Sequence, residues 1–116
     1  MPATETRLYA TQKIKFEWTS DASGDAVITT TNEYTGSIIE VITVPSATAP
    51  TADYDITITD ADSIDVLHGN GADRSATLTE YIAEANLGTV VNSKLTLTVA
   101  NAGDTKSGTA YVYIRT

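Results

Sequence analysis

The C-terminal stretch LTLTVANAGDTKSGTAYVYIR, residues 95–115, alternates apolar and polar side chains on both sides of a glycine-containing turn. Apolar groups stand at every second position from Leu95 to Val99 and again from Ala110 to Ile114. A period of two is the pattern of a strand with one buried face. The stretch therefore predicts an antiparallel hairpin at the C-terminal end of the chain.

Outward from this stretch, five other segments have strand-like patterns: residues 8–18, 26–34, 37–44, 53–59 and 64–67. Thr, Val and Ile are abundant, and their stiff side chains suit a pleated sheet better than a helix. A polar, glycine-containing turn separates the first two segments, which predicts a second hairpin there.

Residues 75–87 fit two local structures. Thr77 and Glu80 have the spacing of a capping box, which would start a short helical turn. The threonines around the segment and its spacing from neighbouring strands favour a strand. We predict the strand and keep the helical turn as the alternative.

These patterns predict an all-β fold: a single-domain antiparallel β-sandwich, Greek-key or jelly-roll-like, with about seven or eight strands. The sandwich is expected over residues 8–116, after a flexible N-terminal arm over residues 1–7. A chain of 116 residues is long enough to bury one core. The chain has no cysteine, so its stability is expected to come from packing and sheet hydrogen bonds.

The charge and hydropathy of the chain exclude several classes of function. Fifteen acidic and seven basic residues give a formal net charge of -8, which disfavours binding to nucleic acid. No apolar run reaches the roughly 18 residues of a membrane span, so no membrane partner is expected. The polar N-terminus lacks the regions of a secretory signal, which predicts a chain made in the cytoplasm or a mature fragment.

The acidic stretch over residues 53–65 is the first candidate for chemistry, because Ca²⁺ prefers clustered carboxylate ligands. The stretch does not fit the helical calcium loop, since the fifth position is Ile64 and the twelfth is Gly71. Asp60 and Asp62 are therefore expected to cap a β-turn. Binding of a cation by the loop over residues 53–65 stays an open alternative.

His68 is the single histidine, and no nearby residues have the spacing of a nucleophile and its base. We expect a solvent-facing histidine in a turn. The glycines that follow it lack the lysine and the helix of a phosphate-binding loop. We therefore predict a non-enzymatic protein with no catalytic residue, no cofactor and no metal.

Three parts of the chain are candidates for contact with a subunit or a protein partner: the N-terminal end, segment 37–44 and the last strand. Tyr111 and Tyr113 lie opposite the apolar face of the last strand, and segment 37–44 is apolar on both faces. The candidate contact residues are Arg7, Leu8, Ile39, Val41, Tyr111 and Tyr113.

Aromatic rings on a β-sandwich can also stack on sugars. Trp18 shares its alternation face with Phe16 and Ile14, so we expect it to be buried rather than displayed. The tyrosines of the last strand suit a protein partner at least as well as a glycan.

Four segments resemble a group of small proteins encoded among the head genes of tailed bacteriophages and prophages. They are Tyr54–Thr59, Asp62–Leu67, Gly69–Thr77 and Lys94–Gly103. The resemblance implies a structural protein of the virion, of the capsid decoration or cement type. It implies no catalytic residues.

A protein of this type would be made in the host cytoplasm and would bind the major capsid protein on the outer capsid surface, stabilising the head. A symmetric homo-oligomer is expected, with a trimer favoured. The alternatives are a carbohydrate-binding β-sandwich module and a head-tail or tail structural component.

Overall fold

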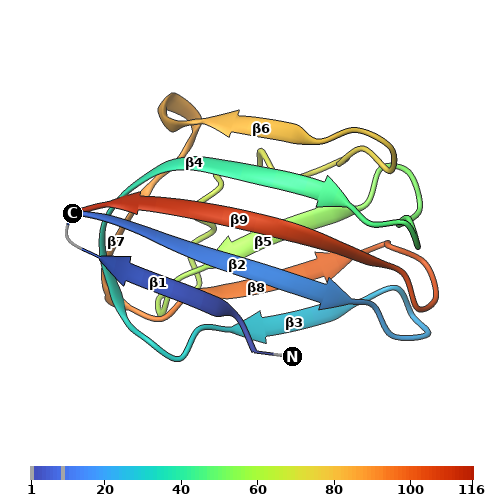
Figure 1. Ribbon diagram of the computed structural model, residues 1–116, viewed down its shortest axis with the longest axis horizontal. Coiled ribbons are helices and arrows are strands. Elements are labelled where there is room, and N and C mark those ends of the chain that lie inside the picture. Colours follow the sequence, from blue (N-terminus) through green and yellow to red (C-terminus); the bar gives the residue numbers. More distant parts are fainter. Residues whose placement is uncertain (1, 9) are drawn as a thin grey trace.

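The computed structural model describes residues 2–8 and 10–116, which form two β-sheets packed face to face (Figure 1). This arrangement confirms the predicted all-β sandwich, with nine strands in the described residues rather than seven or eight. The elements are β1 (Thr4–Leu8), β2 (Thr11–Thr19), β3 (Ala26–Thr29), β4 (Tyr34–Pro45), β5 (Asp55–Thr59), β6 (Glu80–Ala83), the 3₁₀ helix η1 (Glu84–Asn86), β7 (Thr89–Ser93), β8 (Thr96–Ala100) and β9 (Ser107–Arg115).

The larger sheet has the strand order β1-β2-β9-β4-β6, and β7 also pairs with β4. The smaller sheet has the order β3-β8-β5. All of these pairs are antiparallel. The last strand, β9, thus lies in the middle of the larger sheet, between two strands from the first half of the chain (Figure 1).

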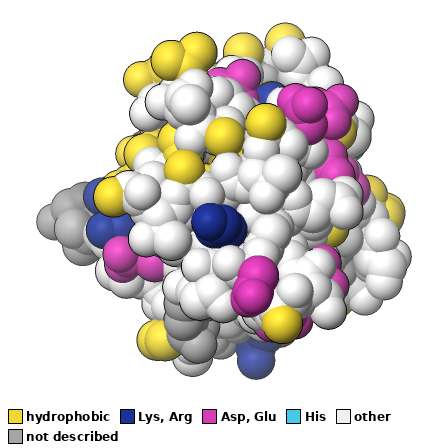
Figure 2. Space-filling model, turned by 90° about the vertical axis from the view of Figure 1, so that its right-hand side faces the viewer, with side chains coloured by type: hydrophobic (Ala, Val, Ile, Leu, Met, Phe, Trp, Pro, Cys, Tyr) yellow, Lys and Arg dark blue, Asp and Glu magenta, His cyan; other side chains and the backbone are white. Residues whose placement is uncertain are grey.

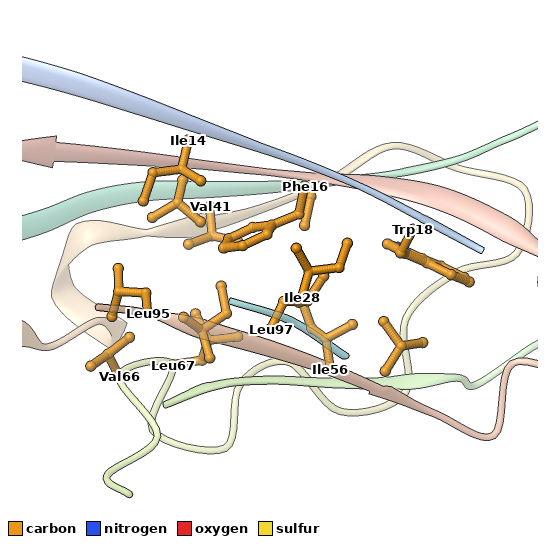
Figure 3. Close-up of a cluster of buried hydrophobic side chains, with 14 of the residues drawn as sticks. Ile14, Phe16, Trp18, Ile28, Val41, Ile56, Val66, Leu67, Leu95 and Leu97 are labelled. Carbon is orange, nitrogen blue, oxygen red and sulfur yellow. The ribbon is translucent and has the colours of Figure 1, made fainter. Parts of the chain in front are cut away.

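The core lies between the sheets, where alternate side chains of each strand meet. Ile14, Phe16 and Trp18 of β2 are at most 1% exposed, which confirms the predicted burial of the tryptophan. Figure 3 shows these three side chains facing Ile56 and Leu97 of the smaller sheet. Burying a large apolar side chain contributes about 1.5–3 kcal/mol, so this layer is the main source of stability.

Both predicted hairpins are wrong, because the chain changes sheet at each of these turns. β2 and β9 lie in the larger sheet, whereas β3 and β8 lie in the smaller one. Alternation fixes which side chains are buried, but it does not fix which strand is the neighbour. The turn residues 20–25 and 101–106 instead form arches that cross the roughly 10 Å between the sheets.

Residues 46–54 form another arch, from β4 to β5, and the three arches meet at one end of the sandwich and bond to one another. The buried Ala102 donates its backbone N–H to the carbonyl of Gly24 at 3.0 Å and accepts from Thr51 N–H at 2.9 Å. Ser20 donates its hydroxyl to the carbonyl of Gly103 at 2.6 Å. Gly24 has a φ of +85°, and a Cβ there would lie 2.9 Å from Gly103 N, so glycine is required.

A bulge in β4 changes the faces predicted for segment 37–44. Ile38 pairs with Ile114, and Glu40 pairs with the adjacent Tyr113. Ile39 is therefore an extra residue in β4 with no partner in β9. Val41 is consequently buried at 0% exposed, while Ile39 is half-buried. Strict alternation would place Ile39 and Val41 on the same face, and the predicted contact role of Val41 is therefore corrected: it is a core residue.

The predicted flexible arm over residues 1–7 is also corrected, except for Met1, which lies outside the described residues. Thr4–Leu8 forms β1, an edge strand paired with β2. Glu5 holds this strand to the β3–β4 connection, since its carboxylate accepts bonds from the N–H groups of Thr31 and Asn32 and from the Tyr34 hydroxyl, at 2.7–3.1 Å.

Two other segments differ from the predictions. Residues 64–67 form no strand: Asp65 makes an isolated bridge to Thr59, and a turn follows at Val66 and Leu67, which are buried under β5. Within residues 75–87, the predicted strand is confirmed only from Glu80 to Ala83, which form β6. The helical turn predicted after Thr77 does not form, and the 3₁₀ helix η1 lies further on, after β6. Glu80 does not cap a helix, because its carboxylate accepts the N–H of Ser75 at 2.7 Å.

The bulge can be tested with the same substitution on each face of β4. Val41→Thr places a hydroxyl in the core and should lower the free energy of unfolding by about 1–3 kcal/mol. Val44→Thr, at a half-buried position of the outer face, should cost less than about 0.5 kcal/mol. Denaturant unfolding of the two variants measures both values, and equal losses would contradict the assigned faces.

Glu5 should make stability depend on pH. Burial raises the pKa of its carboxyl, but the hydrogen bonds that it accepts outweigh this effect and hold the pKa below the ordinary 4.5. The stabilisation is then present above pH 4.5 and is lost as the pH falls through the lowered pKa. The difference in unfolding free energy between wild type and Glu5→Gln should shrink on acidification; a difference independent of pH would contradict this role.

Candidate functional site

Tyrosines from neighbouring strands form a row on the outer face of the larger sheet. The strand registers place Lys15 beside Tyr111, Tyr111 beside Ile42, and Ile42 beside Tyr81. Tyr113 lies two residues further along β9 on the same face. We call this surface the tyrosine face, and it consists of Lys13, Lys15, Ile42, Tyr81, Tyr111 and Tyr113.

The tyrosine face combines exposed rings with nearby positive charge. Tyr81 is 66% exposed, and Tyr111 and Tyr113 are half-buried. The ammonium group of Lys15 lies 5.9 Å from the ring centroid of Tyr111 and 3.6 Å from the Glu17 carboxylate. A cation over an aromatic ring is attracted by about 0.5–1 kcal/mol at an exposed site, so this lysine is partly oriented.

The structure brings together only part of the predicted contact set. Tyr111 and Tyr113 share the tyrosine face, and Ile39 is half-buried in the bulge of β4 beside it. Arg7 lies instead at the β1 edge, where its guanidinium is 6.0 Å from the ring of Tyr34. Leu8 ends β1, and its side chain lies outside the described part of the structure.

The sequence analysis missed Tyr81 and Ile42. Tyr81 belongs to segment 75–87, whose strand and helix signals compete. Ile42 is on the outer face only because of the β4 bulge, which no sequence pattern indicated. The exposed position of Tyr81 beside buried Ile82 follows strand alternation, and this was the available signal.

A shallow hollow of about 350 Å³ continues the outer face at one end of β2 and β9. Its floor includes the edge of Trp18, which lies so close to Gly108 that a Cβ there would be 2.7 Å from the ring. Its lining residues are Glu17, Trp18, Thr19, Ser46, Ser107, Gly108 and Thr109. Hydroxyl groups from Thr19, Ser46, Ser107 and Thr109 line the hollow together with apolar surface.

The end of the sandwich that carries the three arches differs from the tyrosine face. Figure 2 shows this end as mostly uncharged surface with acidic groups at its margins and a basic group near its centre. Asp21, which begins the first arch, accepts the backbone N–H groups of Ser23 and Asp25 at 2.8 and 3.0 Å. This carboxylate therefore shapes a turn.

The acidic stretch over residues 53–65 is also used by the backbone. The Asp60 carboxylate accepts N–H groups of Asp62 and Ile64, which confirms the predicted turn cap for Asp60. Asp65 accepts three backbone N–H groups at 2.9–3.1 Å. Among residues 2–8 and 10–116, no three acidic, histidine or cysteine side chains are placed to hold a metal ion.

His68 is exposed in the turn after Leu67, as predicted. Its φ of +52° is unusual for a residue with a side chain, and its ring packs against Gly88, where a Cβ would lie 2.8 Å from Nε2. The ring thus fills the space that a larger side chain at position 88 would need, which is a packing role.

Tyr54, Arg74 and Glu80 form a cluster of polar side chains that are buried or half-buried. Tyr54 is 0% exposed, and its hydroxyl has no hydrogen-bond partner among the described residues. Burial raises the pKa of Tyr54, and the nearby positive charge of Arg74 partly offsets the rise. Arg74 itself lies 3.8 Å from Glu80. The group links the loop before β6 to the core.

No protein-family model and no curated protein sequence matches the chain. A solved structure described as the crystal structure of FLHE is similar to it with a TM-score of 0.48 and 9% sequence identity. The match covers 93% of this chain and 100% of that one. None of the helices in the described residues is long and apolar enough to cross a membrane.

Because the Asp65 carboxylate bonds to the backbone, we expect it to stabilise the protein without binding an ion. Asp65→Ala leaves three backbone N–H groups without their acceptor and should lower the free energy of unfolding by about 2–3 kcal/mol. Asp62→Ala is the matched control, because that side chain is exposed. Denaturant unfolding with and without Ca²⁺ measures both effects; a stability gain with Ca²⁺ that Asp65→Ala abolishes would contradict this role.

Proposed function

We propose that the chain is a non-enzymatic structural protein of a tailed-bacteriophage head, which binds the major capsid protein on the outer capsid surface and stabilises the head. It would be made in the host cytoplasm and reside on the virion. Support comes from the resemblance of four segments to phage head proteins and from the rigid all-β fold, which suits a surface-bound stabilising protein.

The tyrosine face is the observation that carries the proposal. Tyrosine combines a large apolar ring with a polar hydroxyl, and it is enriched where proteins bind one another. Here Tyr81 and Tyr111 flank Ile42 in one cross-strand row, and four adjacent strands span about 15 Å. A regular sheet under this row gives a broad, rigid surface that loses little conformational entropy on binding.

Charge favours the same face. The chain is strongly acidic overall, but Lys13, Lys15 and Arg115 lie on the outward side of β2 and β9. Glu17 and Glu84 pair with Lys15 and Arg115 at 3.6 and 3.8 Å, and Glu40 lies beside Tyr113, so acidic and basic groups nearly balance on this face. A partner with an acidic or neutral surface would therefore meet less repulsion here than the net charge of the whole chain implies.

Binding to purified capsids tests the proposal. The double variant Tyr81→Ala and Tyr111→Ala should weaken capsid binding by about 30-fold or more, because truncating two aromatic anchors costs more than about 1 kcal/mol each and often 2. The measurement is co-sedimentation over a range of protein concentrations.

The control is Val27→Ala, which removes an equally exposed apolar group, 65% exposed, from the outer face of the smaller sheet. It should leave capsid binding unchanged. Wild-type protein that stays in the supernatant, or equal weakening by both variants, would contradict the proposal.

The second candidate is carbohydrate binding, and the same tyrosines favour it. Exposed rings on a flat sheet can stack on sugar rings, and the hydroxyl groups in the hollow beside Thr109 could bond to sugar hydroxyls. Retardation in gels that contain soluble polysaccharides tests this candidate. Retardation that Tyr81→Ala abolishes would support it, and unchanged mobility in all gels would exclude it.

A further inference from the structure

β1 presents a free edge on the larger sheet. Its backbone pairs with β2 on one side, through five registered residues from Thr4 to Leu8. Thr4, Thr6 and Arg7 are exposed, and Glu5 is half-buried. An unpaired strand edge offers N–H and C=O groups that another strand can bind.

The hydrogen-bond pattern identifies which residues of β1 face outward. Thr116 donates its N–H to the carbonyl of Ala10, so β2 turns the polar groups of its even-numbered residues toward β9. The odd-numbered residues of β2 then face β1, and Lys13 is bonded to Thr6. Glu5 and Arg7, one position to either side of Thr6, direct their N–H and C=O groups away from the sheet.

The other sheet edges are covered or interrupted. The far edge of the larger sheet is divided between β6 and β7, with η1 between them. The edge of β5 is covered by the following loop, where Ile56 N–H bonds to Gly71 and Val66 N–H bonds to Ile58. β3 has four residues. Short length and charged side chains also protect an edge, and β1 has five residues with Glu5 and Arg7 directed toward the β3–β4 connection. Among the described residues, however, no other segment bonds to the outward backbone groups of Glu5 and Arg7.

We propose that β1 pairs antiparallel with β1 of a second copy of this chain, with Thr6 on the two-fold axis, and joins the two larger sheets into one. In this register Glu5 of one copy forms a backbone hydrogen-bonded pair with Arg7 of the second copy. Arg7 of the first copy forms the symmetric pair with Glu5 of the second. The interface then forms about four backbone hydrogen bonds.

Charge selects a second copy of this chain as the occupant. The register that satisfies the outward backbone groups also places each Glu5 opposite an Arg7, so both charged pairs are complementary. Opposite charges across neighbouring strands contribute about 0.2–1 kcal/mol each, whereas like charges repel. The Glu5 carboxylate is already oriented by three hydrogen bonds, and it retains acceptor capacity for a guanidinium.

A disulfide tests the register directly, because the chain has no cysteine of its own. Thr6 would face Thr6 as a non-hydrogen-bonded pair, whose Cα atoms lie about 4.5 Å apart, within the range of a disulfide. With oxidised glutathione, Thr6→Cys should form a covalent dimer on a non-reducing gel. Thr4→Cys is the control, since the two Thr4 residues would lie on opposite sides of the axis and should cross-link at least tenfold more slowly.

Backbone and charge variants test the same contact without cross-linking. Arg7→Pro removes an outward N–H that β2 does not use, so the fold should persist while the dimer dissociation constant rises about tenfold or more. Arg7→Glu should weaken the dimer similarly through repulsion from Glu5. Lys13→Glu makes the same charge change one strand away and should leave the dimer intact.

Sedimentation equilibrium of the full chain, over a wide concentration range, measures these effects, and circular dichroism checks that each variant is folded. A two-fold dimer weakened by both Arg7 variants supports the proposal. A monomer at every concentration, a trimer, or equal cross-linking of Thr6→Cys and Thr4→Cys would overturn it. No capsid is used, so failure here leaves the proposed capsid role standing.

Discussion

The main chain of Ala102 connects the three arches on which the sandwich depends. Its N–H and C=O groups bond to the first and second arches, and its own arch joins β8 to β9. Each arch carries the chain from one sheet to the other, so these bonds fix how the sheets face each other. The apolar layer containing Phe16 and Trp18 can exclude water only when this spacing is held. Packing and arch geometry therefore depend on each other.

The sequence was sufficient for the fold class and for much of the core, because period-two alternation reports burial on one face. It was insufficient for strand pairing, since the turns at residues 20–25 and 101–106 are compatible with a hairpin and with an arch. The bulge of β4 had no signal either, and one inserted residue was enough to move Val41 from the predicted surface to the core. Tyr111 and Tyr113 were placed correctly because β9 is regular throughout.

Side chains on the turns and side chains on the regular strands have different roles at the surface. Carboxylates such as Asp60 and Asp65 are bonded to turns, so the acidic stretch that first suggested an ion site stabilises loops instead. The outward side chains of the larger sheet are not needed to hold turns, and Tyr81, Tyr111 and the lysines lie among them. Features available for recognition are thus concentrated on one sheet, on its face and at its β1 edge.

The position of β9 between β2 and β4 also constrains the order of folding. β2, near the start of the chain, gains its second neighbour only from the last nine strand residues, Ser107–Arg115. During synthesis the paired strands β1 and β2 must therefore wait, with Ile14 and Phe16 exposed, until Ser107–Arg115 has left the ribosome. Pairing at such long sequence separation is slow, in the millisecond to second range typical of all-β sandwiches, so the sandwich is expected to fold only after β9 has been synthesised.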